Sequence, residues 1–492
     1  MIIFSPIYFP FMKLFKSLFI IIASIGILSS CAEDNDDQFA SDRIVKNFIY
    51  RGMNTFYLYK SNVDVLDNDR FATTAELENY HSQFDSPESF FESLIFDRER
   101  TDRFSIIVSD YVALEQALSG NTLNNGMEFG LVRYRDNQSQ VFGYVRYVLP
   151  NSDADNKGVE RGQIFNAIDG IQLNDTNFRT LIAQNTYTIG LADFNGGNPV
   201  ANGDEITLSK SQLQEDPILV SKVITQGNAK IGYLLYNSFL RQYDDDLNAV
   251  FADFKAQGVT NLVLDLRYNS GGSVNTAITL GSLITNNPTT DVYSREQWNP
   301  EVQEFLQNNN PDQLTNFFRN TTFDGDNLNR LGLNKVHIIT TSSSASASEL
   351  VINALDPYIN VVQVGDDTAG KFQASITLYD SEDFGRSGAN TSHRYAMQPL
   401  VLKSLNSIGN TDYFDGLAPD IALREDFGNL GILGDPNEPL LRACLNDISI
   451  NGSIWRPTDI SPSVYNIEFM DSNDFKPLGN EMWKEDTTLP IK

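Results

Sequence analysis

Hydrophobic positions change their spacing along the chain and so divide it into three regions. In residues 41–118, apolar side chains recur three and four positions apart, which is typical of amphipathic helices. The apolar face of the first helix would consist of Ile44, Phe48, Ile49 and Met53. In residues 125–221, short apolar runs are separated by Gly and Asn turns, which predicts a compact β-rich module.

From residue 230 onward, the pattern becomes one of buried strands alternating with helices. Strands are predicted at 231–236, 262–266, 336–340 and 361–364, and helices at 247–254 and around 350–354. Active groups in such folds lie at the carboxyl ends of strands, so candidate chemistry is expected in the loops that follow them. After residue 451 the chain is rich in Pro, Asp and Asn, which predicts a loosely packed tail.

Length and charge narrow the classes of function. At 492 residues, the chain has room for about two to four domains. Its 64 Asp and Glu residues against 36 Lys and Arg give a formal net charge of −28, which opposes binding to nucleic-acid phosphates. The three histidines, His81, His337 and His393, are far apart and never at metal-ligand spacing, so no metal site is expected. No other cofactor is expected either.

The first 31 residues have the layout of a secretory signal. Two lysines, an apolar stretch and small residues lead to Cys31, and Leu28-Ser29-Ser30-Cys31 resembles the bacterial lipobox. This implies lipidation of Cys31, membrane attachment through the lipid, and a location in the cell envelope at the outer membrane or cell surface. A transmembrane anchor is the alternative, but the apolar core at 18–28 is too short for a bilayer of about 30 Å. The acidic residues 32–40 are interpreted as a solvated tether or a surface-export signal.

The strongest chemical signal is a serine-rich turn between a predicted strand and a predicted helix. In Ser344-Ala345-Ser346-Ala347-Ser348-Glu349, Ser346 falls at a helix N-terminus, where free N–H groups and the helix dipole favour negative charge. Gly370-Lys371 follows the next apolar strand. Taken alone, both features have simpler explanations. Ser346 and Glu349 form a Ser-x-x-Glu capping box, and a lysine in a turn is commonly a solvated surface charge.

A third motif gives these two features a common interpretation. Together with Leu264-Asp265-Leu266-Arg267-Tyr268-Asn269-Ser270-Gly271-Gly272, they resemble in order and spacing the carboxyl-terminal processing proteases, from about Phe48 to Cys444. The resemblance implies an α/β catalytic core of the spiral type seen in crotonase and Clp protease. It also implies that Ser346 is the nucleophile and that Lys371, 25 positions later, is the general base.

The same resemblance implies an oxyanion hole and leaves the partner of the lysine open. N–H groups of Gly271 or Gly272 and of Ala347 would hold the oxyanion. Many family members have glutamine four residues after the lysine, where this chain has Ser375. Ser375 can orient Lys371, but Gln373 shares a strand face with it and is the other candidate. The lysine must be neutral part of the time to accept a proton, which burial favours.

Part of the β-rich region resembles a PDZ domain. The resemblance lies in residues 150–162 and in Asn166-Ala167-Ile168-Asp169-Gly170. Met127, Glu128, Phe129 and Gly130 fall where such domains have the loop whose N–H groups capture a terminal carboxylate. The alternative is a turn in a scaffold domain that binds no ligand.

These observations predict an α/β protease with a PDZ-like β-rich domain and an N-terminal helical domain. The expected segments are a lipoprotein signal peptide at 1–31, a tether at 32–40, a helical domain at 41–118, a PDZ-like domain at 119–222, a protease domain at 223–450 and a tail at 451–492. The favoured function is a serine endopeptidase that acts on envelope or extracellular proteins and selects their tails through the PDZ-like domain. The alternatives are a catalytically weak peptide-binding lipoprotein and a binder of small apolar ligands.

Overall fold

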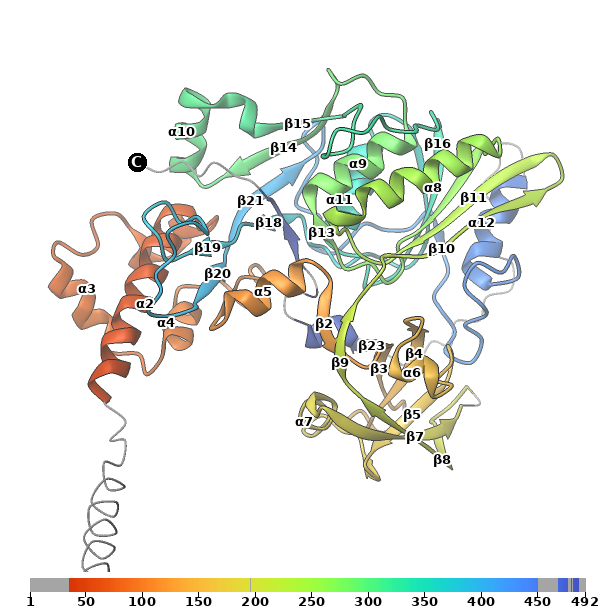
Figure 1. Ribbon diagram of the computed structural model, residues 1–492, viewed down its shortest axis with the longest axis horizontal. Helices are drawn as coiled ribbons and strands as arrows, with labels where there is room; N and C mark the ends of the chain where they lie inside the picture. The colour runs from red at the N-terminus through yellow and green to blue at the C-terminus, as the bar shows by residue number, and fades with distance from the viewer. Residues whose placement is uncertain (1–34, 195, 450–467, 477–478, 480, 486–492) are drawn as a thin grey trace, which may run out of the picture.

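The computed structural model describes residues 35–194, 196–449, 468–476, 479 and 481–485 (Figure 1). The expected signal peptide with its lipidation site Cys31 lies outside the described residues, as do 451–467, 477–478, 480 and 486–492 of the expected tail. Figure 1 shows a helical N-terminal region, a central α/β region and a β-rich domain set beside it. In the described part of the chain, no helix is both long enough and apolar enough to cross a membrane.

The N-terminal region is built on one long helix. It contains α2 (Asn35–Phe56), η2 (Lys60–Asn62), η3 (Asp64–Leu66), α3 (Thr74–His81), α4 (Pro87–Ser93), β1 (Ile106–Val108) and α5 (Tyr111–Leu118). On α2, Phe48, Ile49 and Met53 are buried, as their spacing predicts. Ile44 is 36% exposed and does not join them, so that part of the predicted face is wrong. Helix α2 also begins inside the expected tether.

The β-rich domain, residues 121–214, is connected to the rest of the chain by a two-stranded ribbon. The ribbon pairs β2 (Asn121–Asn124) with β9 (Ser211–Gln214), which lead into and out of the domain. The domain contains β3 (Met127–Arg133), β4 (Val141–Val148), α6 (Asp153–Asn156), β5 (Ile164–Ile168), β6 (Ile171–Gln172), α7 (Phe178–Ala183), β7 (Thr186–Asp193) and β8 (Val200–Ser209). The next strand, β10, starts at Ile218 and belongs to another sheet, slightly before the expected domain boundary at 222.

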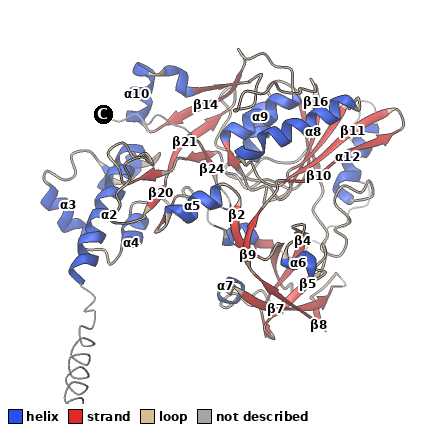
Figure 2. Ribbon diagram, in the orientation of Figure 1, coloured by secondary structure: helices blue, strands red, loops and turns tan. Residues whose placement is uncertain are grey.

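A six-stranded sheet forms the centre of the molecule, with helices on both faces (Figure 2). Its order is β10 (Ile218–Gln226), β11 (Ala229–Tyr236), β12 (Asn261–Asp265), β16 (Lys335–Thr340), β17 (Asn360–Gly365) and β22 (Ile421–Ala422), and the strands from β11 to β22 are parallel. On one face lie α8 (Asp244–Ala256), α9 (Val274–Ile284) and α11 (Ala347–Leu355), and on the other lies α12 (Pro439–Ser449). Leu234 and Tyr236 face the first group, whereas Tyr233 and Leu235 face α12. Burial on both faces explains the continuous apolar runs of the sequence.

A second six-stranded sheet lies next to the N-terminal region. Its order is β13 (Gly272–Ser273), β24 (Met482–Trp483), β18 (Gln373–Ser375), β21 (Leu400–Leu405), β14 (Val292–Trp298) and β15 (Thr315–Phe317). A three-stranded sheet of β1, β20 (Ala396–Gln398) and β19 (Leu378–Tyr379) continues toward α2 and α4. The remaining elements are η4 (Arg241–Tyr243), α10 (Pro300–Asn309) and η5 (Pro311–Leu314).

The end of the described chain packs against two domains. We call residues 468–476, 479 and 481–485 the C-terminal segment. Its strand β23 (Glu468–Asp471) pairs antiparallel with β3, η6 (Ser472–Phe475) follows, and β24 lies between β13 and β18. Asp471, Glu481 and Met482 are buried. The expectation of a loosely packed tail is therefore wrong for these residues, because two sheets provide backbone partners for them.

Candidate active site

Ser346 lies in a strained turn between a strand and a helix. β16 ends at Thr340 and α11 begins at Ala347, so Ser346 is the N-cap residue. Its side chain is fully buried and its φ is 61°, a left-handed value that is uncommon for a residue other than glycine. Such strain costs about 1–3 kcal/mol and gathers at functional sites. An ordinary N-cap residue has extended backbone, so capping alone does not account for this conformation.

The two neighbouring serines of the motif have structural roles. The hydroxyl of Ser344 donates to the carbonyl of Leu266 at 2.8 Å, and that of Ser348 donates to the carbonyl of Asn269, also at 2.8 Å. Both bonds attach the start of α11 and the turn that carries the predicted nucleophile to the glycine loop, residues 266–272. We call residues 341–346 the nucleophile turn. These hydroxyl protons are therefore used in holding two loops together.

The Glu349 carboxylate joins the nucleophile turn to the loop that carries Lys371. Its Oε2 accepts hydrogen bonds from the backbone N–H of Ser346 at 2.8 Å and of Lys371 at 2.9 Å. Its Oε1 accepts from Gly370 N–H at 2.7 Å and from the Thr368 hydroxyl at 2.6 Å. Burial raises the pKa of Glu349 to about 7, although all four hydrogen bonds act in the opposite direction. Because one oxygen binds both N–H groups, Ser346 and Lys371 are held side by side.

Lys371 is completely buried among one aromatic ring and several acidic side chains. Its Nζ lies 2.7 Å from Glu481 Oε2 and 4.2 Å from the centre of the Phe104 ring. Burial lowers the pKa of Lys371, while Glu481, Asp102 and Glu349 act to raise it. Burial also raises the pKa of Glu481 to about 7, against the effect of Lys371. Burial thus favours the neutral amine that can accept a proton, whereas the Glu481 carboxylate favours the charged form of Lys371.

The glycine loop approaches Ser346 too closely for any side chain. A Cβ atom at Gly271 would lie 2.5 Å from the Cβ of Ser346, and one at Gly272 would lie 2.3 Å from the carbonyl oxygen of Phe239. Their φ angles of 125° and 134° also require glycine. Of the predicted oxyanion donors, the Gly271 N–H already donates to Asn269 Oδ1 at 3.0 Å. The other two predicted donors are Gly272, the first residue of β13, and Ala347, the first residue of α11, which directly follows Ser346 in the chain.

A fully buried arginine fixes the glycine loop from behind. The Arg267 guanidinium contacts Asp265 at 2.8 Å, Glu438 at 2.7 Å and Glu425 at 3.0 Å. All three carboxylates are also almost inaccessible to solvent. Asp265 and Arg267, which both belong to the Leu264–Gly272 motif, are therefore part of a larger buried ionic cluster.

Neither predicted partner of the lysine contacts it in the hydrogen bonds of the described residues. Gln373 donates instead to the hydroxyl of Tyr59 at 2.8 Å. Ser375 donates toward Gln398 Oε1 at 3.1 Å and Glu481 Oε2 at 3.3 Å, so it reaches Lys371 only through Glu481. Sequence reasoning missed Glu481, because it follows Lys371 by more than a hundred residues in a stretch with no recognisable motif.

The predicted carboxylate-binding residues form a strand. Met127, Glu128, Phe129 and Gly130 begin β3 and are all buried, which corrects the expectation of a loop. They pair with β4 on one side, and Glu128 and Phe129 also bind the C-terminal segment. Ser472 Oγ donates to Glu128 Oε2 at 2.5 Å and accepts from Phe129 N–H at 3.3 Å.

A hollow of about 480 Å³ opens beside the nucleophile turn. Residues from the turn, the lysine loop, the N-terminal region and the C-terminal segment surround it, among them Ala345, Ala369, Phe104 and Met470. It is large enough for part of an extended peptide. Within the described residues, no group of three or more His, Cys, Asp or Glu side chains is placed to hold a metal ion.

Comparisons with known proteins identify the family of two parts of the chain. Residues 230–423 match the peptidase family S41 domain and residues 45–106 match the peptidase S41 N-terminal domain, which together make up about half of the chain. Carboxyl-terminal-processing peptidase 3, chloroplastic, from Arabidopsis thaliana is 24% identical over 233 residues, which cover 45% of this chain and 41% of that protein. "Probable CtpA-like serine protease" from Staphylococcus epidermidis is 22% identical over 216 residues, with coverages of 43% and 37%.

The match thus spans about two fifths of the length of these curated relatives. A solved S41 protease structure from Bacteroides fragilis NCTC 9343 covers 82% of this chain and 97% of its own, with a TM-score of 0.60 and 26% identity. Its agreement extends well beyond the two matched domains. The chain therefore belongs to peptidase family S41, the family of the carboxyl-terminal processing proteases.

Proposed function

We propose that this protein is a serine endopeptidase in which Ser346 is the nucleophile and Lys371 the general base. The observation that carries the proposal is the shared hydrogen-bond acceptor Glu349 Oε2, which fixes the backbones of both residues in one buried site. A hydroxyl nucleophile and a buried amine are the two groups that a serine–lysine mechanism needs.

The reaction proceeds in two halves. Ser346 Oγ attacks the peptide carbonyl carbon while its proton passes to the neutral Nζ of Lys371. The C–N bond then breaks and the lysinium returns that proton to the leaving amine, which gives an ester on Ser346. Water, deprotonated by the same amine, attacks the ester, and the released Ser346 oxygen regains a proton.

Backbone N–H groups stabilise the tetrahedral oxyanion in both halves. We assign this role to Gly272 and Ala347, since the Gly271 N–H is bound to Asn269. One such donor contributes about 2.7–4 kcal/mol to transition-state stabilisation. The strain at Ser346 keeps its hydroxyl close to both the helix N-terminus and the glycine loop.

The proposal extends to the choice of substrate and to location. The β-rich domain acts as a PDZ-like module that binds the tail of a substrate protein by adding it as a strand to β3. Support comes from β23, which already pairs with β3 in this manner. Lipidation at Cys31 would hold the enzyme at the cell envelope, where exported proteins are its substrates.

A catalytically weak peptide-binding lipoprotein is the second candidate. It is favoured by the 2.7 Å contact between Lys371 and Glu481, since a protonated lysine accepts no further proton. The two candidates differ in whether the bound peptide is cut.

Cleavage of a protein substrate tests the proposal. The full-length chain is incubated at pH 7 to 9 with an unfolded protein that has an apolar C-terminus, and products are identified by mass spectrometry. Ser346→Ala and Lys371→Ala are measured at equal folded concentration, with Lys255→Ala, an exposed lysine on α8, as the matched control.

The proposal predicts cleavage by the parent chain and by Lys255→Ala, and loss of cleavage in the other two variants. Cleavage that persists in Ser346→Ala would contradict the assigned nucleophile. Binding of the substrate without cleavage by any form would support the second candidate.

A further inference from the structure

The C-terminal segment lies in a groove of the β-rich domain. Its β23 pairs antiparallel with β3, and the segment also packs against α7. Phe469 and Phe475 both pack edge-on against Phe178 of α7, with ring centres 5.7 and 6.2 Å apart, and Phe475 also contacts Phe129 of β3. A strand between a sheet edge and a helix, with aromatic side chains inserted, is the arrangement of a bound peptide.

Charged groups hold the segment along the same path. Arg146 of β4 is 2% exposed, and its guanidinium binds Asp471 at 2.6 Å and also Glu468. The Ser343 hydroxyl, in the nucleophile turn, donates to the same Asp471 carboxylate at 2.6 Å. The groove and the catalytic turn therefore share one contact residue on the segment.

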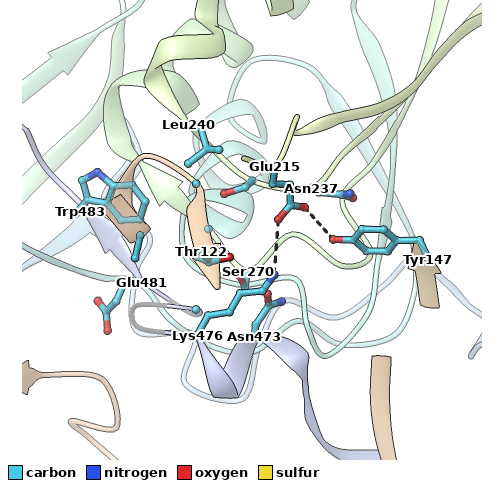
Figure 3. Close-up of a pocket in the computed structure, with 15 residues that line it drawn as sticks. Thr122, Tyr147, Glu215, Asn237, Leu240, Ser270, Asn473, Lys476, Glu481 and Trp483 are labelled. Atoms are coloured by element: carbon cyan, nitrogen blue, oxygen red, sulfur yellow. Dashed lines mark hydrogen bonds and ion pairs between the residues drawn. The ribbon is translucent and has the colours of Figure 1, made fainter. Parts of the chain in front are cut away.

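A second set of charges continues toward the catalytic centre. Lys476 lies 2.8 Å from Glu128 and 3.6 Å from Glu215, and Figure 3 shows this lysine beneath Glu215, which also accepts from Tyr147. Glu481 and Trp483 line the same small pocket as Ser270 and Gly271 of the glycine loop. Described residues of the segment thus contact both the groove and the pocket beside the glycine loop.

At the catalytic centre, the segment occupies the position that a substrate backbone needs. β24 pairs in parallel with β13 in the register Gly272 to Met482, alongside a proposed oxyanion donor. A Cβ atom at Gly271 would be 2.7 Å from the carbonyl oxygen of Glu481 and 2.5 Å from Ser346 Cβ, so that peptide carbonyl lies near the nucleophile. The Glu481 side chain meanwhile pairs with Lys371.

We propose that the C-terminal segment is an intramolecular occupant of one continuous peptide-binding track, and that a substrate must displace it before Lys371 can act as a base. This inference rests on the proposed function. A peptide with the chemistry of the segment competes best: a short strand followed by one turn of 3-10 helix, with an aromatic residue, a carboxylate two positions later and a second aromatic residue six positions after the first.

Displacement has two consequences for the enzyme. An occupant tethered to its own site has an effective concentration in the millimolar range, so only a substrate that binds the groove well replaces it. When Glu481 leaves with the segment, Lys371 loses the carboxylate nearest its Nζ. Its neutral form is then favoured by burial, and the base becomes competent only when substrate is bound.

The first test weakens the segment without altering the catalytic centre. In the full-length chain, Phe469→Ala and Phe475→Ala are combined, and kcat/KM is measured with a substrate well below its KM. The matched control combines Ile171→Ala and Val200→Ala, two apolar residues of the same domain that are 52% and 65% exposed. We call the Phe469→Ala, Phe475→Ala double variant the groove variant, because it should empty the groove. We expect it to be at least tenfold more active than the parent, and the control to remain within twofold.

The second test measures occupancy without catalysis. A fluorescent peptide with the sequence of residues 468–485 is titrated into full-length Ser346→Ala, with and without the two Phe→Ala substitutions. The peptide should bind at least tenfold more tightly when the phenylalanines are removed. Equal affinity for both forms, with both folded as judged by circular dichroism, would overturn the inference.

The two tests separate this inference from the proposed function. If no form cleaves any substrate but the peptide binds the released groove, the occupied track is supported and the peptidase proposal fails. If the parent cleaves substrates and the groove variant is no more active, the peptidase proposal stands and the inference is overturned.

Discussion

The catalytic centre has two walls, and a buried arginine holds each of them in a different way. Arg267 fixes the glycine loop through Asp265, Glu425 and Glu438, which all belong to the protease core. The other wall is the C-terminal segment, and Arg146 holds it through the carboxylates of Glu468 and Asp471.

The difference lies in what happens when each cluster breaks. Carboxylates around Arg267 have no route to water while the sheet remains folded, so their charges would stay buried and unpaired. Those around Arg146 can leave with the segment and become hydrated. We therefore interpret the first wall as a permanent scaffold and the second as a displaceable one.

The largest expected effect comes from replacing Ser346, the proposed nucleophile, whose turn is bonded to the permanent wall. Ser346→Ala should lower kcat/KM by at least about a thousandfold, because removal of a nucleophile leaves only the binding and oxyanion contributions. The measurement is the initial rate of peptide cleavage. Ser344→Ala, in the same motif, serves as its control and should stay within about tenfold of the parent. A similar loss in both variants would show that the rate depends on the turn and not on the Ser346 hydroxyl.

Replacement of the two arginines compares the walls directly. Arg267→Met should reduce the free energy of unfolding by about 3–5 kcal/mol, since it leaves buried carboxylates without a partner. Arg146→Met should reduce it clearly less. Urea denaturation of both variants in a Ser346→Ala background, which prevents self-digestion, provides the measurement. Equal losses would remove the distinction between the walls.

The pH dependence of activity reports on the ion pair between Lys371 of the protease core and Glu481 of the C-terminal segment. Burial lowers the pKa of Lys371, and the Glu481 carboxylate raises it, so Glu481→Gln should lower it further. Because the neutral amine is the base, activity increases as pH rises through the pKa of this group. The variant should therefore reach its plateau at lower pH and be about tenfold more active at pH 7. Matched pH profiles of kcat/KM check this, and an unchanged profile would contradict the role given to Glu481.

The smallest effect is expected from a structural serine of the permanent wall. Ser344→Ala removes the hydrogen bond to the Leu266 carbonyl and should cost about 1 kcal/mol of stability. Thermal unfolding in the Ser346→Ala background would detect this loss. A cost above about 3 kcal/mol would mean that the turn depends on this single bond far more than the geometry suggests.

The sequence predicts the permanent wall much better than the displaceable one. The apolar runs at 231–236 and 262–266 correspond to β11 and β12, because burial on both faces leaves a local pattern in the chain. Residues 336–340 and 361–364 likewise fall in β16 and β17. The motif residues Ser346 and Lys371 come together because they follow adjacent parallel strands of one sheet.

The displaceable wall depends on contacts between residues far apart in the chain. Asp471 meets Arg146 across more than three hundred residues, and Glu481 meets Lys371 across more than a hundred. Neither pairing leaves a periodic pattern, and the Pro, Asp and Asn content of the chain after residue 451 favours the prediction of a loose tail. For the same reason, the sequence predicts Ser375 or Gln373, which are near the lysine in the chain, as the third residue of the site.

The central claim is that Ser346 attacks the substrate carbonyl. Its most direct test is mass spectrometry of the full-length chain, quenched in acid milliseconds after mixing with an activated ester of a peptide. The account predicts an acyl adduct on the proteolytic fragment that contains Ser346, and none in Ser346→Ala. Turnover with an adduct on another residue, or with no adduct under conditions where acylation is faster than hydrolysis, would contradict it.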